Sequence, residues 1–283
     1  MRGGETALVT GASRGIGKGI AIALGAGGAT VFVTGRTRRG GEGPFPGSVE
    51  ETAEQITKAG GRGIALQCDH HDDEQVAAVF GRIAAQSGRL DLLVNNATAL
   101  PAALVGQGGF WERSLELADM FDVGLRSTYV ASWHAAALMA GAGKGLIASI
   151  SFYGAVSYFH GPAYGAQKAA VDKMMFDMAV ELKPHGVAAL SIWPGMARTE
   201  KVVGRWSAIP GGAERLAGYE SPAYTGLVID ALVRDPDLMK LSGSTVIAAE
   251  YGAEAGIADL DGSQPRSYRA TMGAPHRFLM GAG

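Results

Sequence analysis

Tyr164 and Lys168 have the side chains and the spacing for proton transfer, and they form the one Tyr-x3-Lys pair of the chain. Residues four apart share one face of a helix. An ammonium group beside a phenol favours the phenolate and lowers the tyrosine pKa, which prepares the phenol to exchange protons. Ser151, thirteen residues earlier, follows an apolar run and could hydrogen-bond a substrate oxygen. We therefore predict that Ser151, Tyr164 and Lys168 are catalytic.

A glycine-rich turn near the N-terminus has the composition of a phosphate-binding loop. It includes Gly11, Ser13, Arg14, Gly15, Ile16 and Gly17, and lies between an apolar run and a helical pattern. Glycines let the backbone approach a pyrophosphate, and a helix N-terminus offers free N–H groups. We predict a dinucleotide site here; the alternative is a glycine-rich turn without a ligand.

The end of the second apolar run bears on the choice of cofactor. It reads Thr34-Gly35-Arg36-Thr37 and lacks the carboxylate that usually holds the ribose hydroxyls of NAD. Arg36 and Arg14 instead offer planar guanidinium groups suited to a phosphate. We predict NADP(H) in preference to NAD(H), and interpret Arg38 and Arg39 as solvated loop charges.

Polar residues follow the third and fourth apolar runs. Asn95 to Ala97 lie where the ligand crevice of a parallel sheet is expected. Asp69 could contact the adenine or equally belong to the start of the next helix. The adjoining His70-His71 pair is interpreted as part of a polar loop near the adenine rather than as a metal site.

Seven short apolar runs alternate with helical patterns, which predicts a doubly wound α/β fold with helices on both faces of a parallel sheet. The strands are expected at 7–10, 30–34, 63–68, 92–95, 145–151, 187–193 and 244–248. The helices are expected near 15–27, 48–59, 72–87, 114–141, 162–183 and 221–234. Residues 197–218 are expected to form a long irregular loop. We predict one domain over 1–283, with a core at about 5–250 and an extension, 251–283, that packs on the domain or covers a partner subunit.

The overall composition excludes some classes of function. A net charge of −2 gives no attraction to nucleic acid or to an acidic membrane surface. No uncharged apolar run reaches the roughly 20 residues that span a bilayer, and no signal-peptide pattern is visible. Cys68 is the one cysteine, which rules out an intrachain disulfide and favours a cytoplasmic protein.

The combination of glycine loop, Asn-Asn-Ala, strand-end serine and Tyr-x3-Lys resembles the classical short-chain dehydrogenase/reductase family over about residues 5–250. The resemblance implies a seven-stranded Rossmann-type domain, with Tyr164 as general acid/base and Lys168 as its activator and ribose ligand. Pro194-Gly195 matches a family motif, and Thr199 matches a threonine that contacts the nicotinamide carboxamide. Residues 193–195 and 251–262 resemble the member 1-like branch, carbonyl reductases that prefer NADPH.

The resemblance also implies a homodimer or homotetramer, formed by the apolar faces of helices 114–141 and 162–183. A small carbonyl or alcohol substrate is expected in an apolar pocket, and about half of the residues proposed for it are expected to be plain core. These residues are Phe152, Tyr153, Tyr158, Phe159, Trp193, Met196, Val202 and Trp206.

Two departures from the family pattern stand out. Thr98 replaces the last glycine of Asn-Asn-Ala-Gly, and Gly124 replaces the catalytic asparagine, whose carbonyl holds a relay water in the family. Because glycine keeps that carbonyl, we expect the relay to survive. Gly124 also makes a rival function plausible, a non-catalytic NADP(H)-binding redox sensor.

Overall fold

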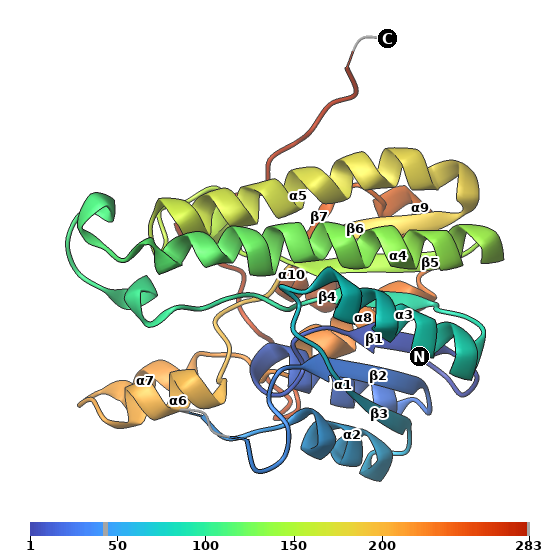
Figure 1. Cartoon of the computed structure of the whole chain (residues 1–283). Coiled ribbons are helices and arrows are strands. Elements are labelled where there is room, and N and C mark those ends of the chain that lie inside the picture. The colour runs from blue at the N-terminus through green and yellow to red at the C-terminus, as the bar shows by residue number, and fades with distance from the viewer. Residues whose placement is uncertain (42–44, 282–283) are drawn as a thin grey trace.

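The computed structural model describes residues 1–41 and 45–281 and is built around one parallel sheet (Figure 1). The seven strands run in the order β3-β2-β1-β4-β5-β6-β7. Their bounds are β1 (Thr6–Val9), β2 (Thr30–Gly35), β3 (Arg62–Gln67), β4 (Leu92–Asn95), β5 (Gly145–Ile150), β6 (Val187–Trp193) and β7 (Thr245–Ile247). All six strand pairings are parallel, which confirms the predicted fold class.

Helices cover both faces of this sheet because successive strand residues point to opposite sides. In β1, Ala7 and Val9 enter one apolar core and Leu8 enters the other. The first core is closed by α1 (Gly15–Ala26), α2 (Val49–Lys58) and α8 (Tyr224–Arg234). The second is closed by α3 (Asp73–Ser87), α4 (Ser127–Ala142) and α5 (Pro162–Leu182).

Two of the three helix starts predicted from capping residues are confirmed. The Ser48 hydroxyl accepts a hydrogen bond from Glu51 N, and Asp72 caps α3. The helix expected from residue 221 begins instead at Tyr224. Ser221 does not cap it because its N–H and hydroxyl both donate to Asp259.

Two expectations at the carboxyl edge of the sheet are wrong. The helix expected at 114–141 is broken into a 3₁₀ turn, η3 (Leu115–Ala118), a π-helical segment, η4 (Phe121–Arg126), and α4. The loop expected at 197–218 contains α6 (Glu200–Ser207) and α7 (Gly212–Ala217). Residues 101–118, which we call the arm, and the α6–α7 pair project from the same edge of the sheet (Figure 1).

The C-terminal segment contacts the rest of the domain through Tyr268 and Asp261. Tyr268 N donates to the Tyr153 hydroxyl at 3.0 Å, and Arg198 pairs with Asp261 at 3.2 Å. The short helices α9 (Leu238–Leu241), α10 (Ala248–Glu254) and α11 (Arg269–Met272) complete this end of the chain. Within the described ranges, no helix is long and apolar enough to cross a membrane.

Candidate active site

Helix α5 places Tyr164 and Lys168 on one face, as predicted. Pro162 at the first helical position fixes its start. The Lys168 ammonium lies 5.5 Å from the centre of the Tyr164 ring and donates to the Ile150 carbonyl at 3.1 Å. The Lys168 side chain therefore lies between the Tyr164 ring and the end of β5.

Burial governs the charge states of this pair. It raises the pKa of Tyr164, the opposite of the effect expected from Lys168. Burial also lowers the pKa of Lys168 to about 8, and the Asp172 carboxylate partly opposes that shift. At neutral pH the phenol is thus protonated and the lysine is largely cationic, which suits a proton donor beside a positive charge.

Ser151 lies directly after β5, at the predicted strand end, but its hydroxyl faces inward. Its Oγ donates to the Lys168 carbonyl at 3.1 Å, and the residue is 1% exposed. To bond a substrate oxygen, the hydroxyl must rotate about χ1, which a serine can do between staggered positions.

Asp172 is a buried residue of the site that sequence reasoning missed. Its carboxylate accepts hydrogen bonds from Ser191 Oγ and from Trp193 Nε1. It lies four residues after Lys168, so the Tyr-x3-Lys spacing simply continues for one more turn of α5. That repeated spacing was the available signal.

Gly124 sits in the π-helical break, with a φ of 140° that side-chain-bearing residues rarely adopt. A Cβ here would lie 2.8 Å from Gln167 Nε2 and 2.9 Å from Thr98 Oγ1. Its carbonyl accepts hydrogen bonds from Gln167 Nε2 and Thr128 Oγ1, both at 2.9 Å. Because these side chains occupy both lone pairs, the structure does not support the relay water expected on this carbonyl.

The glycine loop joins β1 to α1, as predicted, and its helix end already binds an anion. Arg14, at the N-cap, gives α1 no side-chain cap, and Gly15 N donates to Glu200 Oε2 at 2.8 Å. A carboxylate thus stands where a phosphate oxygen would fit, so the site suits an anionic cofactor. Ser13 and Ile16 are half-buried in the same turn. Gly17 packs so closely on Asn96 that a Cβ would meet its Nδ2 at 2.3 Å.

Arg14 and Arg36, the two candidate phosphate ligands, differ in how many hydrogen bonds their side chains make within the protein. Arg14 donates to Thr37 Oγ1 and to the carbonyls of Pro46 and Gly47, so it ties down the loop after β2. Arg36 is exposed, and its side chain has no hydrogen bond or ion pair among residues 1–41 and 45–281. Of the predicted cations, Arg36 is therefore the one available to a phosphate.

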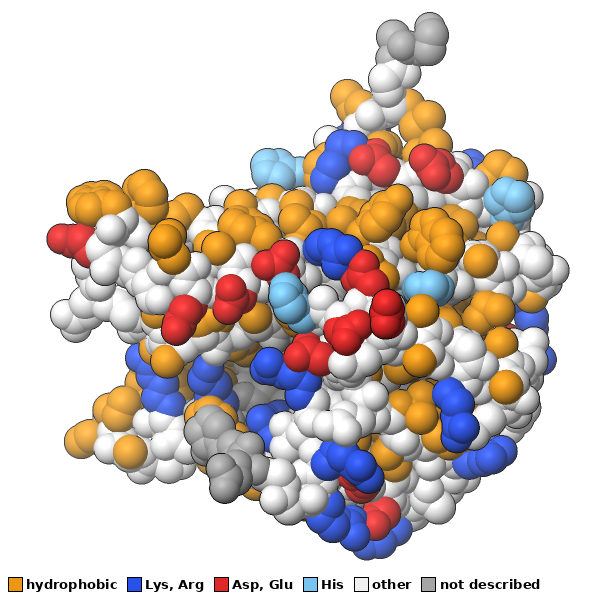
Figure 2. Space-filling model, in the orientation of Figure 1, with side chains coloured by type: hydrophobic (Ala, Val, Ile, Leu, Met, Phe, Trp, Pro, Cys, Tyr) orange, Lys and Arg blue, Asp and Glu red, His pale blue; other side chains and the backbone are white. Residues whose placement is uncertain are grey.

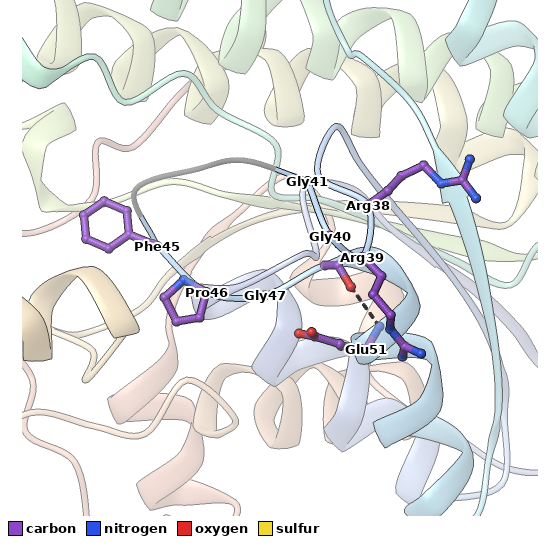
Figure 3. Close-up of a pocket in the computed structure, with 9 residues that line it drawn as sticks. Arg38, Arg39, Gly40, Gly41, Phe45, Pro46, Gly47 and Glu51 are labelled. Carbon is purple, nitrogen blue, oxygen red and sulfur yellow. Dashed lines mark hydrogen bonds between the residues drawn. The ribbon is translucent and has the colours of Figure 1, made fainter.

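A recess opens beside this loop, lined by Arg38, Arg39, Gly47 and Glu51 among others. Figure 3 shows both arginine side chains reaching out from the loop. Arg38 pairs with Glu50 at 2.9 Å and Arg39 with Glu54 at 2.6 Å, so carboxylates already neutralise these two arginines.

The polar residues after β3 and β4 form hydrogen bonds with other residues of the protein. Asp69 Oδ1 accepts from His71 N, which builds the turn before α3. His70 is buried rather than part of a polar loop, and burial lowers its pKa to about 4. Asn95 Nδ2 donates to Ser132 and Ser149, and Ala97 N donates to Thr10 Oγ1. No cluster of three metal-binding side chains occurs in the described part of the chain.

A second missed carboxylate, Glu220, shapes the Pro194-Gly195 turn after β6. Its Oε2 accepts from Gly195 N at 3.0 Å, and burial raises its pKa to about 8. Thr199 caps α6 through a hydrogen bond from Val202 N, and its methyl group lies next to Gly15. The start of α6 thereby lies against the glycine loop.

The residues expected around the substrate differ in burial. Tyr153 and Trp193 are wholly buried core, whereas Tyr158 is 82% exposed. Phe152 and Phe159 pack near Tyr164, with ring centres 6.4 and 5.8 Å from its own. Met196 joins this cluster, and Val202 and Trp206 lie on α6.

Comparisons with known proteins agree with this geometry. The family model described as short chain dehydrogenase matches residues 5–208. The chain belongs to the short-chain dehydrogenase family. It is 36% identical to the mouse (Mus musculus) dehydrogenase/reductase SDR family member 1 over 277 residues, covering 94% of this chain and 86% of that protein. The human (Homo sapiens) protein of the same name is 34% identical over the same shares of both chains.

The fold comparison reaches the same family. A crystal structure of a short chain dehydrogenase from Mycobacterium thermoresistibile superimposes with a TM-score of 0.76 at 26% identity, covering 91% of this chain and 89% of that one. The part of the chain that matches the short-chain dehydrogenase model contains the glycine loop, Ser151, Tyr164, Lys168 and Thr199. Glu220 and the C-terminal segment lie beyond it.

Proposed function

We propose that this short-chain dehydrogenase is an NADP(H)-dependent oxidoreductase that interconverts a carbonyl and an alcohol. The observation that carries the proposal is the half-buried Tyr164 beside Lys168, at the edge of the sheet that bears the glycine loop. In the family, this edge holds the cofactor and the substrate. The whole chain is proposed to act as one domain.

The proposed roles follow from the protonation states. In reduction, Tyr164 gives its proton to the carbonyl oxygen, and the Lys168 ammonium stabilises the phenolate that remains. The rotated hydroxyl of Ser151 would hold the same oxygen. The bound nicotinamide supplies the hydride in this direction and accepts it in the reverse one. Asn95, Ala97, Asp69, Pro194, Gly195 and Thr199 are proposed to line the cofactor site.

The test of catalysis is a Tyr164→Phe variant, which keeps the ring and removes the proton. We expect turnover of a panel of aldehydes and ketones to fall about 10²- to 10⁴-fold, while NADPH binding is retained. If the wild-type protein binds NADPH but converts none of these substrates, the redox-sensor alternative is favoured instead.

The proposed preference for NADP(H) rests on Arg36, the arginine available after β2. We expect NADPH to bind more tightly than NADH in a fluorescence titration, and Arg36→Ala to lose most of that difference. Arg38→Ala is the matched control, because Glu50 already neutralises Arg38. Tighter binding of NADH by the wild-type protein would contradict the proposal.

The remaining proposals concern setting and assembly. The free, buried Cys68 supports a reducing, cytoplasmic location, and burial raises the pKa of its thiol to about 12. The exposed aromatic side chains of α4 support a homodimer or homotetramer.

A further inference from the structure

Glu220 is a buried residue whose position is fixed by its own backbone. It is 4% exposed and lies beyond the part of the chain that matches the family model. Glu220 N donates to the Met196 carbonyl, and the Glu220 carbonyl accepts from Arg198 N, both at 2.9 Å. This short parallel bridge sets Glu220 beside the segment that follows the Pro194-Gly195 turn. Its side chain is therefore held close to that turn.

The carboxyl group of Glu220 binds the backbone of the turn. Its Oε2 accepts from Gly195 N at 3.0 Å, and its Oε1 accepts from Thr225 Oγ1 at 3.3 Å. The contact is close, because a Cβ on Gly195 would lie 2.6 Å from Oε2. Gly195 is itself buried, so without this carboxyl group its N–H would lose its hydrogen-bond partner away from water.

The same hydrogen bond determines where the neighbouring carbonyl points. A trans peptide unit is planar, so its N–H and C=O groups point in opposite directions. Because the Gly195 N–H points at Glu220, the Pro194 carbonyl points away from it. No N–H or O–H group of residues 1–41 and 45–281 donates to that carbonyl. Pro194 directly follows β6, at the edge where parallel sheets bind their ligands.

The C-terminal segment packs around this turn and supports Glu220. The next residue, Ser221, donates from its N–H and its hydroxyl to Asp259, which is buried. The Tyr268 ring lies 3.4 Å from where a Cβ on Gly195 would be. Residues beyond the family match thus fix both Glu220 and the turn that it binds.

We infer that Glu220 is a positioning residue, which orients the Pro194-Gly195 peptide so that the Pro194 carbonyl accepts a hydrogen bond from the nicotinamide carboxamide. The inference rests on the proposed function, because it assigns a role at the same cofactor site. A carboxamide has two N–H donors, which a carbonyl with no donor of its own can accept. Thr199, which is proposed to line the same site, lies four residues after Gly195. Glu220 would thereby act on the nicotinamide end of the cofactor and not on its adenine end.

The experiment compares NADPH with 2′-phospho-ADP-ribose, which has the adenine and the phosphates of NADPH but no nicotinamide. Affinities are measured by calorimetry. Glu220→Leu, which removes both acceptor oxygens, should weaken NADPH binding about tenfold and leave binding of the fragment unchanged. Glu220→Gln should restore most of the lost affinity, because an amide oxygen can accept the same hydrogen bond. Burial raises the pKa of Glu220 to about 8, so a neutral side chain is a fair substitute near pH 7.

Glu220→Asp is a milder variant that decides the question if Glu220→Leu does not fold. Its shorter side chain draws the carboxyl group back from Gly195 N, so it should show the same selective loss to a smaller degree. NADH and ADP-ribose form a second ligand pair, and the comparison therefore stands even if the proposed preference for NADP(H) is wrong.

Tyr251→Phe is the matched control, since it removes one hydrogen bond to a carboxylate, that of Asp235, without touching the turn. It should bind both ligands like the wild-type protein. The inference is overturned if the Glu220 variants bind NADPH normally, if they lose NADPH and the fragment equally, or if Glu220→Gln behaves like Glu220→Leu. A selective loss in a protein that turns over no substrate would refute the proposed catalysis and leave the role of Glu220 supported.

Discussion

At Tyr164 and Lys168, burial acts on two groups whose charged forms have opposite signs. It keeps the tyrosine neutral and makes the lysine easier to deprotonate. The lysine pKa of about 8 therefore sets the upper limit of the pH range in which an ammonium stands beside the phenol.

The first prediction concerns Asp172, whose carboxylate raises the pKa of Lys168 against the effect of burial. Because the ammonium form is the active one in the proposed mechanism, kcat/KM for carbonyl reduction should fall as pH rises through about 8. In Asp172→Asn the fall should begin at lower pH, since the supporting negative charge is gone. A pH–rate profile of both proteins tests this. An unchanged alkaline limb would show that Asp172 acts only through its hydrogen bonds to Ser191 and Trp193.

The second prediction concerns Gly124. Gly124→Ala should lower the free energy of unfolding by about 1–3 kcal/mol, because of the positive φ and the contacts with Gln167 and Thr98. Gly143→Ala is the control, with a φ of 69° and nothing within 4 Å of the added Cβ. It should cost only about 1 kcal/mol. Equal losses in urea denaturation would mean that the close contacts around Gly124 relax at no cost.

The sequence allowed us to predict those residues of the site that lie close to one another along the chain. Tyr164, Lys168 and Ser151 were predicted in this way, and the structure places them at one edge of the sheet. Glu220 could not be identified, because its role depends on a contact with Gly195, 25 residues away.

At the scale of elements, α6 is held to the glycine loop by one charged contact, from Glu200 to Gly15 N. A cofactor phosphate that binds the same N–H must displace this carboxylate. Glu200→Gln keeps an oxygen that can accept the bond but removes the competing charge. We therefore expect the Kd of NADPH to fall, on the order of tenfold.

The control for this third prediction is Glu214→Gln on α7, which removes an equal charge from the same projecting pair of helices. Its cofactor affinity should match that of the wild-type protein. Weaker NADPH binding by Glu200→Gln would mean that the carboxylate supports the cofactor site rather than competing for it.

Elements with strong local patterns were predicted well. The five inner strands of the sheet are apolar runs largely buried on both faces, so their positions follow from composition alone. The break at Phe121–Arg126 was missed because its periodicity continues that of α4, and its tertiary contacts, such as the hydrogen bond from Gln167 Nε2 to the Gly124 carbonyl, are not visible in the sequence. Helices α6 and α7 are short and mostly exposed, so they leave little apolar pattern to detect.

At the scale of the whole molecule, the outer face of α4 exposes large aromatic side chains. Tyr129 is 55% and Trp133 is 62% exposed, and Figure 2 shows hydrophobic side chains spread over this face. Exposed apolar patches of this kind mark association surfaces. The fourth prediction is that the protein is a dimer or tetramer and that Trp133→Glu shifts it toward monomer in light scattering.

Trp111→Glu is the matched control, because Trp111 is also largely exposed, at 75%, but lies on the arm. That variant should keep the wild-type mass. If Trp133→Glu leaves the mass unchanged while the wild-type protein is oligomeric, the subunits associate through another surface.

The contacts of the C-terminal segment also determine the order in which the two halves of the site form during synthesis. Residues 6–95 are enough to build the glycine loop and the strands that flank it. The wall behind Tyr164, by contrast, is finished only when Tyr268 reaches the Tyr153 hydroxyl. Because chains emerge from the ribosome N-terminus first, the nascent protein should become able to hold its cofactor well before it can enclose a substrate.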